Sequence, residues 1–95
     1  MQKPDITRVF KGPGNEFEVE IVFAQEGNQS PKEGHAYDEI IVVTDGVIAL
    51  ERSDQEGIET YSKNDYIFLP KGTVHQITAK EGFVKIVIIH PDRQE

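Results

Sequence analysis

Short runs in which apolar and polar residues alternate make up most of this 95-residue chain. The clearest run covers residues 16–23, and its period of two predicts a half-buried strand. We expect the apolar residues of this strand to face the core and its glutamates to face water. The apolar residues are Phe17, Val19, Ile21 and Phe23, and the glutamates are Glu16, Glu18 and Glu20.

Similar patterns predict seven more short strands, and no window combines an apolar helical stripe with helix caps. Asp45-Gly46 is a strong hairpin signal, and Lys80-Glu81-Gly82 separates the last two strands. The sequence therefore predicts an all-β sandwich or barrel. The further strands are expected at residues 6–10, 40–43, 47–50, 58–61, 66–69, 73–79 and 83–89.

Composition narrows the class of protein. The chain carries 17 acidic and 10 basic residues, a formal net charge of −7, which argues against binding to nucleic acid or to an anionic membrane. It has no cysteine, so a disulfide framework and a thiolate metal site are both excluded. We find no signal region and no apolar run of transmembrane length. We expect one soluble, cytoplasmic domain spanning residues 1–95.

Two segments carry the residues with chemistry. In the first, Glu33, His35 and Glu39 occupy odd positions near the start of a predicted strand, so an extended chain points them to the same side. In the second, Pro70-Lys71-Gly72 predicts a tight turn, and His75 follows it. His75 shares its strand face with Ile77 and Ala79.

Together these segments resemble the two motifs of the cupin family. His35, Glu39 and Gly46 match the second histidine, the glutamate and the closing glycine of the first motif, and Pro70, Gly72 and His75 match the second motif. Either motif alone is weak, whereas both in this order on an all-β chain are specific. The resemblance covers about residues 31–79 and implies a single cupin-type jelly-roll β-barrel of two packed antiparallel sheets.

The chain departs from the family pattern at three positions. Glu33 stands where the first motif has its first histidine, Asn64 stands where the second motif opens with glycine, and Ala79 replaces a frequent asparagine. Asn64 is a tolerable replacement, because asparagine adopts positive φ more readily than other non-glycine residues. Glu33 is the departure that affects the chemistry of the site.

The resemblance implies a divalent metal site inside the barrel, formed here by His35, Glu39, His75 and Glu33. Two imidazoles and two carboxylates suit iron, manganese, nickel or zinc. Binding is expected to weaken as pH falls through about 6.5, where histidine takes up a proton. Glu33 has three possible roles: a fourth ligand, a general base beside the metal, or a surface residue. His90, before Pro91 near the chain end, is expected at the surface.

Three functions remain open at this stage. The first is a metal-dependent enzyme with isomerase or dioxygenase-type chemistry on a small polar molecule, such as a sugar or organic acid. The second is a non-catalytic module that binds or senses a small molecule, and the third is a degenerate member without metal. Five aromatic residues are candidates for pocket walls: Tyr37, Tyr61, Tyr66, Phe68 and Phe83. The apolar positions Ile40 and Val42, with the apolar last strand, predict a homodimer.

Overall fold

The computed structural model describes residues 5–11 and 17–92, and the described residues form β-strands joined by turns and loops, without a helix. This confirms the predicted all-β class. None of the described residues forms a helix with the length and hydropathy needed to cross a membrane. The strands are β1 (Asp5–Lys11), β2 (Glu18–Ala24), β3 (Glu39–Arg52), β4 (Ile58–Tyr61), β5 (Tyr66–Leu69) and β6 (His75–His90).

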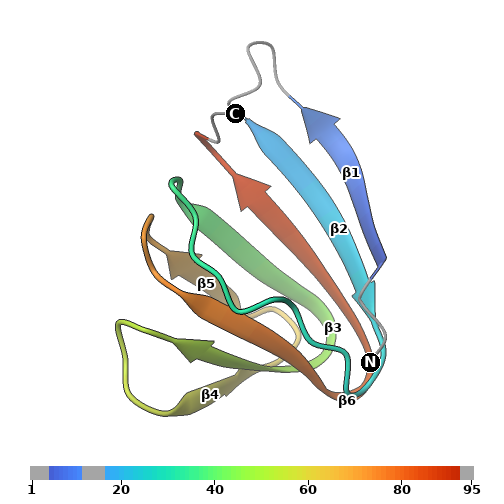
Figure 1. Ribbon diagram of the computed structural model, residues 1–95. Helices are drawn as coiled ribbons and strands as arrows, with labels where there is room; N and C mark the ends of the chain where they lie inside the picture. The colour runs from blue at the N-terminus through green and yellow to red at the C-terminus, as the bar shows by residue number, and fades with distance from the viewer. Residues whose placement is uncertain (1–4, 12–16, 93–95) are drawn as a thin grey trace.

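The two long strands β3 and β6 organise the fold, because they pair with each other along both of their halves. The first half of β3 and the second half of β6 belong to one layer, which has the strand order β1-β2-β6-β3-β5. The second half of β3 and the first half of β6 belong to the other layer, where β4 pairs with β3. Figure 1 shows how both strands bend from one layer into the other. All named pairs are antiparallel, as in a jelly-roll barrel.

The prediction of a hairpin at Asp45-Gly46 is wrong. β3 continues through these residues, and the register with β6 shifts on both sides of Asp45, as it does at a β-bulge. Gly46 has φ +81°, and a Cβ atom there would collide with the carbonyl of Phe83 and lie 2.9 Å from Val84 Cγ2. The glycine therefore permits a bend where two backbones touch. β6 likewise continues through residues 80–82, where Gly82 has φ +59°.

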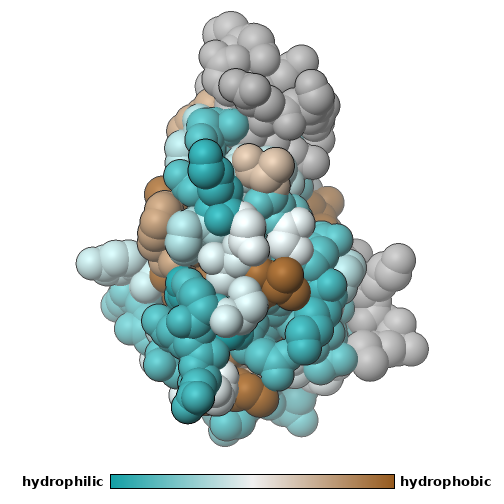
Figure 2. Space-filling view, turned by 60° about the vertical axis from the view of Figure 1, so that its left-hand side comes forward, coloured by the Kyte–Doolittle hydropathy of each residue, from teal (hydrophilic) through white to brown (hydrophobic). Residues whose placement is uncertain are grey.

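The hydrophobic core lies between the two layers. It is formed by the inward-facing residues of β2, β3, β5 and β6, and β3 contributes the most completely buried ones. These include Ile41, Val43, Ile48 and Leu50. On the face shown in Figure 2, hydrophobic residues occur as small separate patches among hydrophilic ones.

The predicted orientation of the strand at residues 16–23 is also wrong. Glu18 is completely buried, whereas Phe17 and Phe23 each keep 37% of their surface exposed. Val22 and Ala24 share the inner face with Glu18. The pattern identified the strand and its period correctly, but the glutamate side faces the interior because Glu18 has a buried histidine as its partner there. Glu16 lies outside the described residues.

Candidate metal centre

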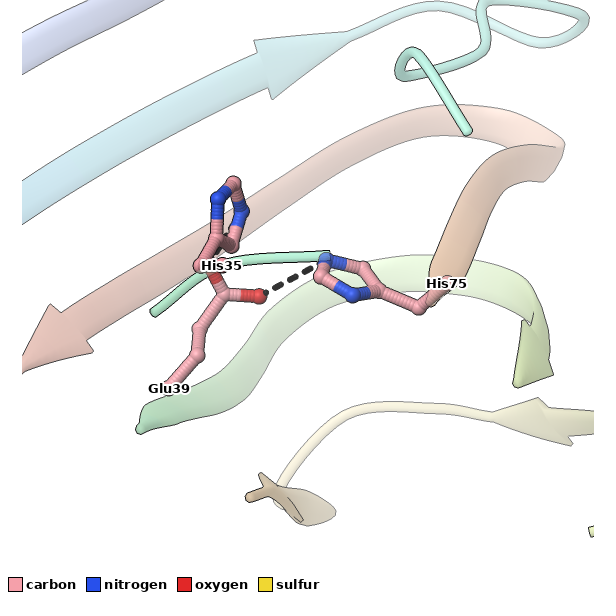
Figure 3. Close-up of side chains that lie close together, drawn as sticks. All are labelled: His35, Glu39 and His75. Atoms are coloured by element: carbon pink, nitrogen blue, oxygen red, sulfur yellow. Dashed lines mark ion pairs between the residues drawn. The ribbon is translucent and has the colours of Figure 1, made fainter. Parts of the chain in front are cut away.

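Three of the four predicted ligands lie together at one end of the barrel interior. Glu39 begins β3, His75 begins β6, and His35 lies in the segment that leads into β3 (Figure 3). One donor atom from each of the three lies within 4.8 Å of the other two. His75 Nε2 is 3.1 Å from Glu39 Oε2, and His35 Nε2 is 3.8 Å from Glu39 Oε1.

Backbone hydrogen bonds join the two motifs directly. The N–H of Glu33 donates to the carbonyl of His75 and the N–H of His75 donates to the carbonyl of Glu33, both at 3.1 Å. The N–H of Gly72 donates to the carbonyl of His35 at 2.8 Å. Gly72 has φ +86°, so the tight turn requires its glycine. The segment before β3 is thereby held along the start of β6, and this places His35 beside His75.

The orientation of His75 suits a metal ligand. Its Nδ1 lies 3.1 Å from the carbonyl oxygen of Thr73. A carbonyl can only accept a hydrogen bond, so Nδ1 carries a proton, and when the imidazole is neutral its lone pair lies at Nε2. Metal-binding histidines are usually fixed in this way by a second partner on the other ring nitrogen.

Glu33 lies beside this group of residues and not within it. Its Oε1 is 4.0 Å from His35 Nε2, and 54% of its side chain is exposed. It is absent from the set of donor atoms that lie within 4.8 Å of one another among the described residues. Glu33 therefore borders the site from the solvent side.

His90, expected at the surface, is buried with 3% of its surface exposed, so that expectation is wrong. Its Nδ1 contacts Glu18 Oε1 at 3.0 Å and its Nε2 contacts Glu39 Oε1 at 2.7 Å. Both ring nitrogens face carboxylates, which favours the doubly protonated, positively charged imidazole. A signal in the sequence could have found it: His90 continues the inward positions Ile86 and Ile88 at a period of two.

The ionisation of the group follows from these contacts. Burial alone would raise the pKa of Glu39, but its contacts with His75 and His90 outweigh burial and lower that pKa from 4.5 to about 2. Burial also opposes the positive charge of His75 and His90, yet contact with Glu39 outweighs it and raises both pKa values. Burial lowers the pKa of His35, and Glu39 only partly offsets this. Glu39 is thus an anion at neutral pH.

A cavity of about 220 Å³, here called the histidine cavity, opens over these groups. Tyr37 forms part of its wall: its ring stacks on His35 at 4.8 Å between centroids and meets the edge of His90 at 4.7 Å. Tyr66, Phe68 and Phe83, which were also candidates for pocket walls, are instead more than half exposed. The full lining is Ile6, Glu20, Ser30, Pro31, Glu33, His35, Tyr37, Glu39, His75, Ile77, Ile88 and His90.

The residues present fit a divalent metal ion. Two donors on one ion, each about 2.1 Å from it, lie roughly 3.0–3.4 Å apart, and the Glu39–His75 separation of 3.1 Å agrees. Glu39 Oε2 is buried and accepts no aligned hydrogen bond from the described residues, although His75 Nε2 is close. This unsatisfied oxygen faces the cluster. Imidazole nitrogen with carboxylate oxygen is a donor set for first-row metals.

Comparison with known proteins identifies the fold. Neither family models nor curated proteins give a match. Among solved structures, a cupin-2 domain protein from Shewanella frigidimarina is 26% identical, with a TM-score of 0.75 over 96% of this chain and 83% of that one. An RmlC-like cupin from Methanocaldococcus jannaschii is 13% identical, with a TM-score of 0.83 over 97% and 83%.

A third similar structure is the DMSP lyase DddQ from Ruegeria pomeroyi. It is 15% identical, with a TM-score of 0.83, and the match covers 98% of this chain and 49% of the lyase. These likenesses agree with the two motifs and with the antiparallel two-layer architecture. The chain therefore has the fold of a small cupin domain.

Proposed function

We propose that this chain binds one divalent metal ion through His35, Glu39 and His75 and that the barrel takes a small molecule at that ion. The observation that carries the proposal is the convergence of the three donor atoms, with Nδ1 of His75 fixed by Thr73 so that Nε2 points into the group. Iron, manganese, nickel and zinc all suit this set of donors.

When bound, such an ion would polarise an oxygen of the ligand or activate dioxygen, which is the chemistry of an isomerase or a dioxygenase. The chain's own residues have separate roles. His90 holds Glu39 at 2.7 Å and so orients its carboxylate toward His75. Tyr37 covers one side of His35. Glu33, solvent-accessible and 4.0 Å from His35, is placed to accept a proton from a ligand at the mouth of the site.

A second candidate function is a metal-free module that binds or senses a small molecule. One observation favours it: Glu39 already has two histidine partners, at 2.7 and 3.1 Å, and Glu33 does not complete the donor set. Enzymes do occur on this fold, since one of the similar structures is named as a lyase. Fold alone does not decide between catalysis and binding.

Elemental analysis of protein purified without an affinity tag or chelator tests the proposal. We expect about one equivalent of metal per chain, lost in His35→Ala and in His75→Ala. Gln76→Ala is the matched control, because Gln76 follows His75 on the opposite strand face and bonds the carbonyl of Ser30 instead. Wild-type protein that stays free of metal after reconstitution with each of the four ions would contradict the metal site and favour the second candidate.

We also propose that two copies of the chain pair through the outer face of the β1-β2-β6-β3-β5 layer. Hydrophobic residues meet there across four strands: Val19 pairs with Ile89, Ile89 with Ile40, and Ile40 with Phe68. The next row is also apolar and continues from Ile21 through Val87 and Val42 to Tyr66. A broad apolar sheet face on a small domain is typical of an interface.

Light scattering tests the pairing. We expect twice the mass of one chain for the wild type and a single-chain mass for Val42→Lys, which places a charge at the centre of the face. Ile58→Lys is the control, because Ile58 is equally apolar and 64% exposed but lies on β4 in the other layer. A single-chain mass for the wild type would refute the dimer and leave the metal site untouched.

A further inference from the structure

The barrel interior contains a second cavity that adjoins the histidine cavity. It has a volume of about 300 Å³, and we call it the apolar cavity. The two cavities share five lining residues, so they adjoin inside the barrel. The shared residues are Ile6, Ser30, Pro31, Ile77 and Ile88.

Beyond the shared residues, the apolar cavity is walled almost entirely by aliphatic side chains. These are Val22, Ala24, Ile48, Ala79, Val84 and Ile86. Its two polar residues are already engaged within the chain: Asn28 Oδ1 accepts a hydrogen bond from the N–H of Gln25, and Ser30 Oγ accepts one from the N–H of Ile77, both at 2.9 Å. A sugar would lose most of its hydrogen bonds to water here without replacement.

The size of the apolar cavity fits a hydrocarbon group. An aliphatic cavity of roughly 150 Å³ accommodates benzene. Twice that volume accommodates a substituted ring or a chain of several carbons. Two small side chains, Ala24 and Ala79, create part of this space, and both are buried.

The histidine cavity has the opposite character. Glu20, Glu33 and Glu39 border it together with three histidines. These carboxylates outnumber the positively charged His90, so a negatively charged group would be repelled unless a further cation lay among them. The metal ion proposed above would supply that cation, so an oxygen-bearing anionic head group suits this end.

We propose that the ligand is a small amphipathic acid, with its carboxylate at His35, Glu39 and His75 and a hydrocarbon body in the apolar cavity. This inference rests on the proposed metal site for the position of the head group. It narrows the ligand from small polar molecules in general to acids with an apolar body. Acids without such a body fill only one of the two cavities.

Straight-chain carboxylates from acetate to hexanoate test the inference, with amide chemical shifts of the zinc-loaded, isotope-labelled protein as the readout. Affinity should rise about fourfold for each added methylene group, since each one leaves water for an apolar wall. The amide signals of Ala79 and Ile86 should move only with the longer acids. Equal affinity across the series, with zinc still bound, overturns this inference and leaves the proposed function standing.

Ala79→Leu fills the apolar cavity without touching the histidine cavity. It should weaken hexanoate binding at least tenfold and leave acetate binding and the zinc content unchanged. Lys80→Leu is the matched control, because it adds the same side chain at the next, exposed position and should change none of these. If Ala79→Leu does not fold, the carboxylate series on the wild-type protein still tests whether the apolar cavity binds the hydrocarbon body.

A second series separates failure of the inference from failure of the metal site. Straight-chain alcohols from ethanol to hexanol, added to metal-free protein, should show the same rise with chain length, because the hydrocarbon body enters the same cavity. If the protein takes no zinc but the alcohols show this rise, the metal site fails and the apolar cavity stands. If neither series depends on chain length, the apolar cavity has no ligand and the inference is wrong.

Discussion

The two faces of the β1-β2-β6-β3-β5 layer differ in a way that reverses the usual expectation. On the inner face, at one end, the charged residues Glu18, Glu39 and His90 are almost fully buried. On the outer face, apolar residues such as Ile40 and Ile89 remain partly exposed. At this end of the layer, hydropathy therefore does not decide which side faces inward.

The charges on the inner face are tolerated because they compensate one another. His90 lies between Glu18 and Glu39, and Glu39 lies between His90 and His75, so carboxylates and imidazoles alternate along the group. Paired and hydrogen-bonded charges can be buried, whereas an isolated one would be very costly. The outer face has no such internal partner among the described residues, and a second copy of the chain would cover it.

Of the substitutions that compare the two faces, removal of His90 should cause the largest loss of stability. His90→Leu leaves Glu18 and Glu39 buried without the cation between them, so the free energy of unfolding should fall by about 3–5 kcal/mol. Ile89→Leu, the next residue on the outer face, should cost less than about 1.5 kcal/mol. Urea denaturation of both variants gives the two free energies of unfolding. Equal losses in the two variants would show that the pairing of the buried charges does not contribute to stability.

The second-largest effect should be the pH dependence of stability in the metal-free protein. Glu39 has a folded pKa of about 2 against 4.5, so its stabilisation is complete above pH 4.5 and is lost as pH falls toward 2, by roughly 3 kcal/mol. His75 and His90 have raised folded pKa values, so their contribution is complete below 6.5 and is lost as pH rises through those values. The lowered pKa of His35 acts in the opposite sense.

Stability should therefore peak at mildly acidic pH. Unfolding curves in urea between pH 2 and 9, with a chelator present, measure this. The loss on the alkaline side should shrink in His90→Leu. A stability that increases steadily from pH 5 to 9 in the wild type would contradict the pairing of His75 and His90 with Glu39.

A smaller effect compares neighbouring isoleucines on opposite faces. Ile41→Val should cost about 1 kcal/mol at any protein concentration, since Ile41 is completely buried within the chain. In dilute solution, Ile40→Val should lower the stability by only a few tenths of the loss expected for Ile41→Val. At protein concentrations where dimers form, its loss should approach that of Ile41→Val. Thermal melts at two protein concentrations distinguish them, and a cost for Ile40→Val that never changes with concentration would count against a covered outer face.

Much of the fold and part of the site could be predicted from sequence. The alternation correctly indicated where strands occur, although it divided β3 and β6 into two strands each. Asn64 does adopt positive φ, at 77°. The motif spacing correctly brought His35, Glu39 and His75 together, because backbone pairing of residue 33 with residue 75 aligns the two motifs. Short sequence patterns, including the two motifs, were therefore enough to predict these features.

The remaining features depend on contacts between distant residues. Gly46 looks like a hairpin residue, but its role is set by the close approach of β6, more than thirty residues away. Glu18 and His90 are opposite each other in the β2–β6 register, a pairing that neither residue's neighbours reveal. A period of two identifies the two faces of a strand but not which face is inside. For the start of β2, the inward direction follows from the pairing of Glu18 with His90 on β6.

The most direct test of the central claim, that the inner face contains metal ligands beside a structural cation, is to follow the ring nitrogens of the three histidines by NMR during a zinc titration. We expect Nε2 of His35 and of His75 to shift on zinc binding, while His90 keeps a proton on both ring nitrogens throughout. If His90 lost a proton and shifted with zinc, or if none of the three rings responded, this division of roles among the three histidines would be wrong.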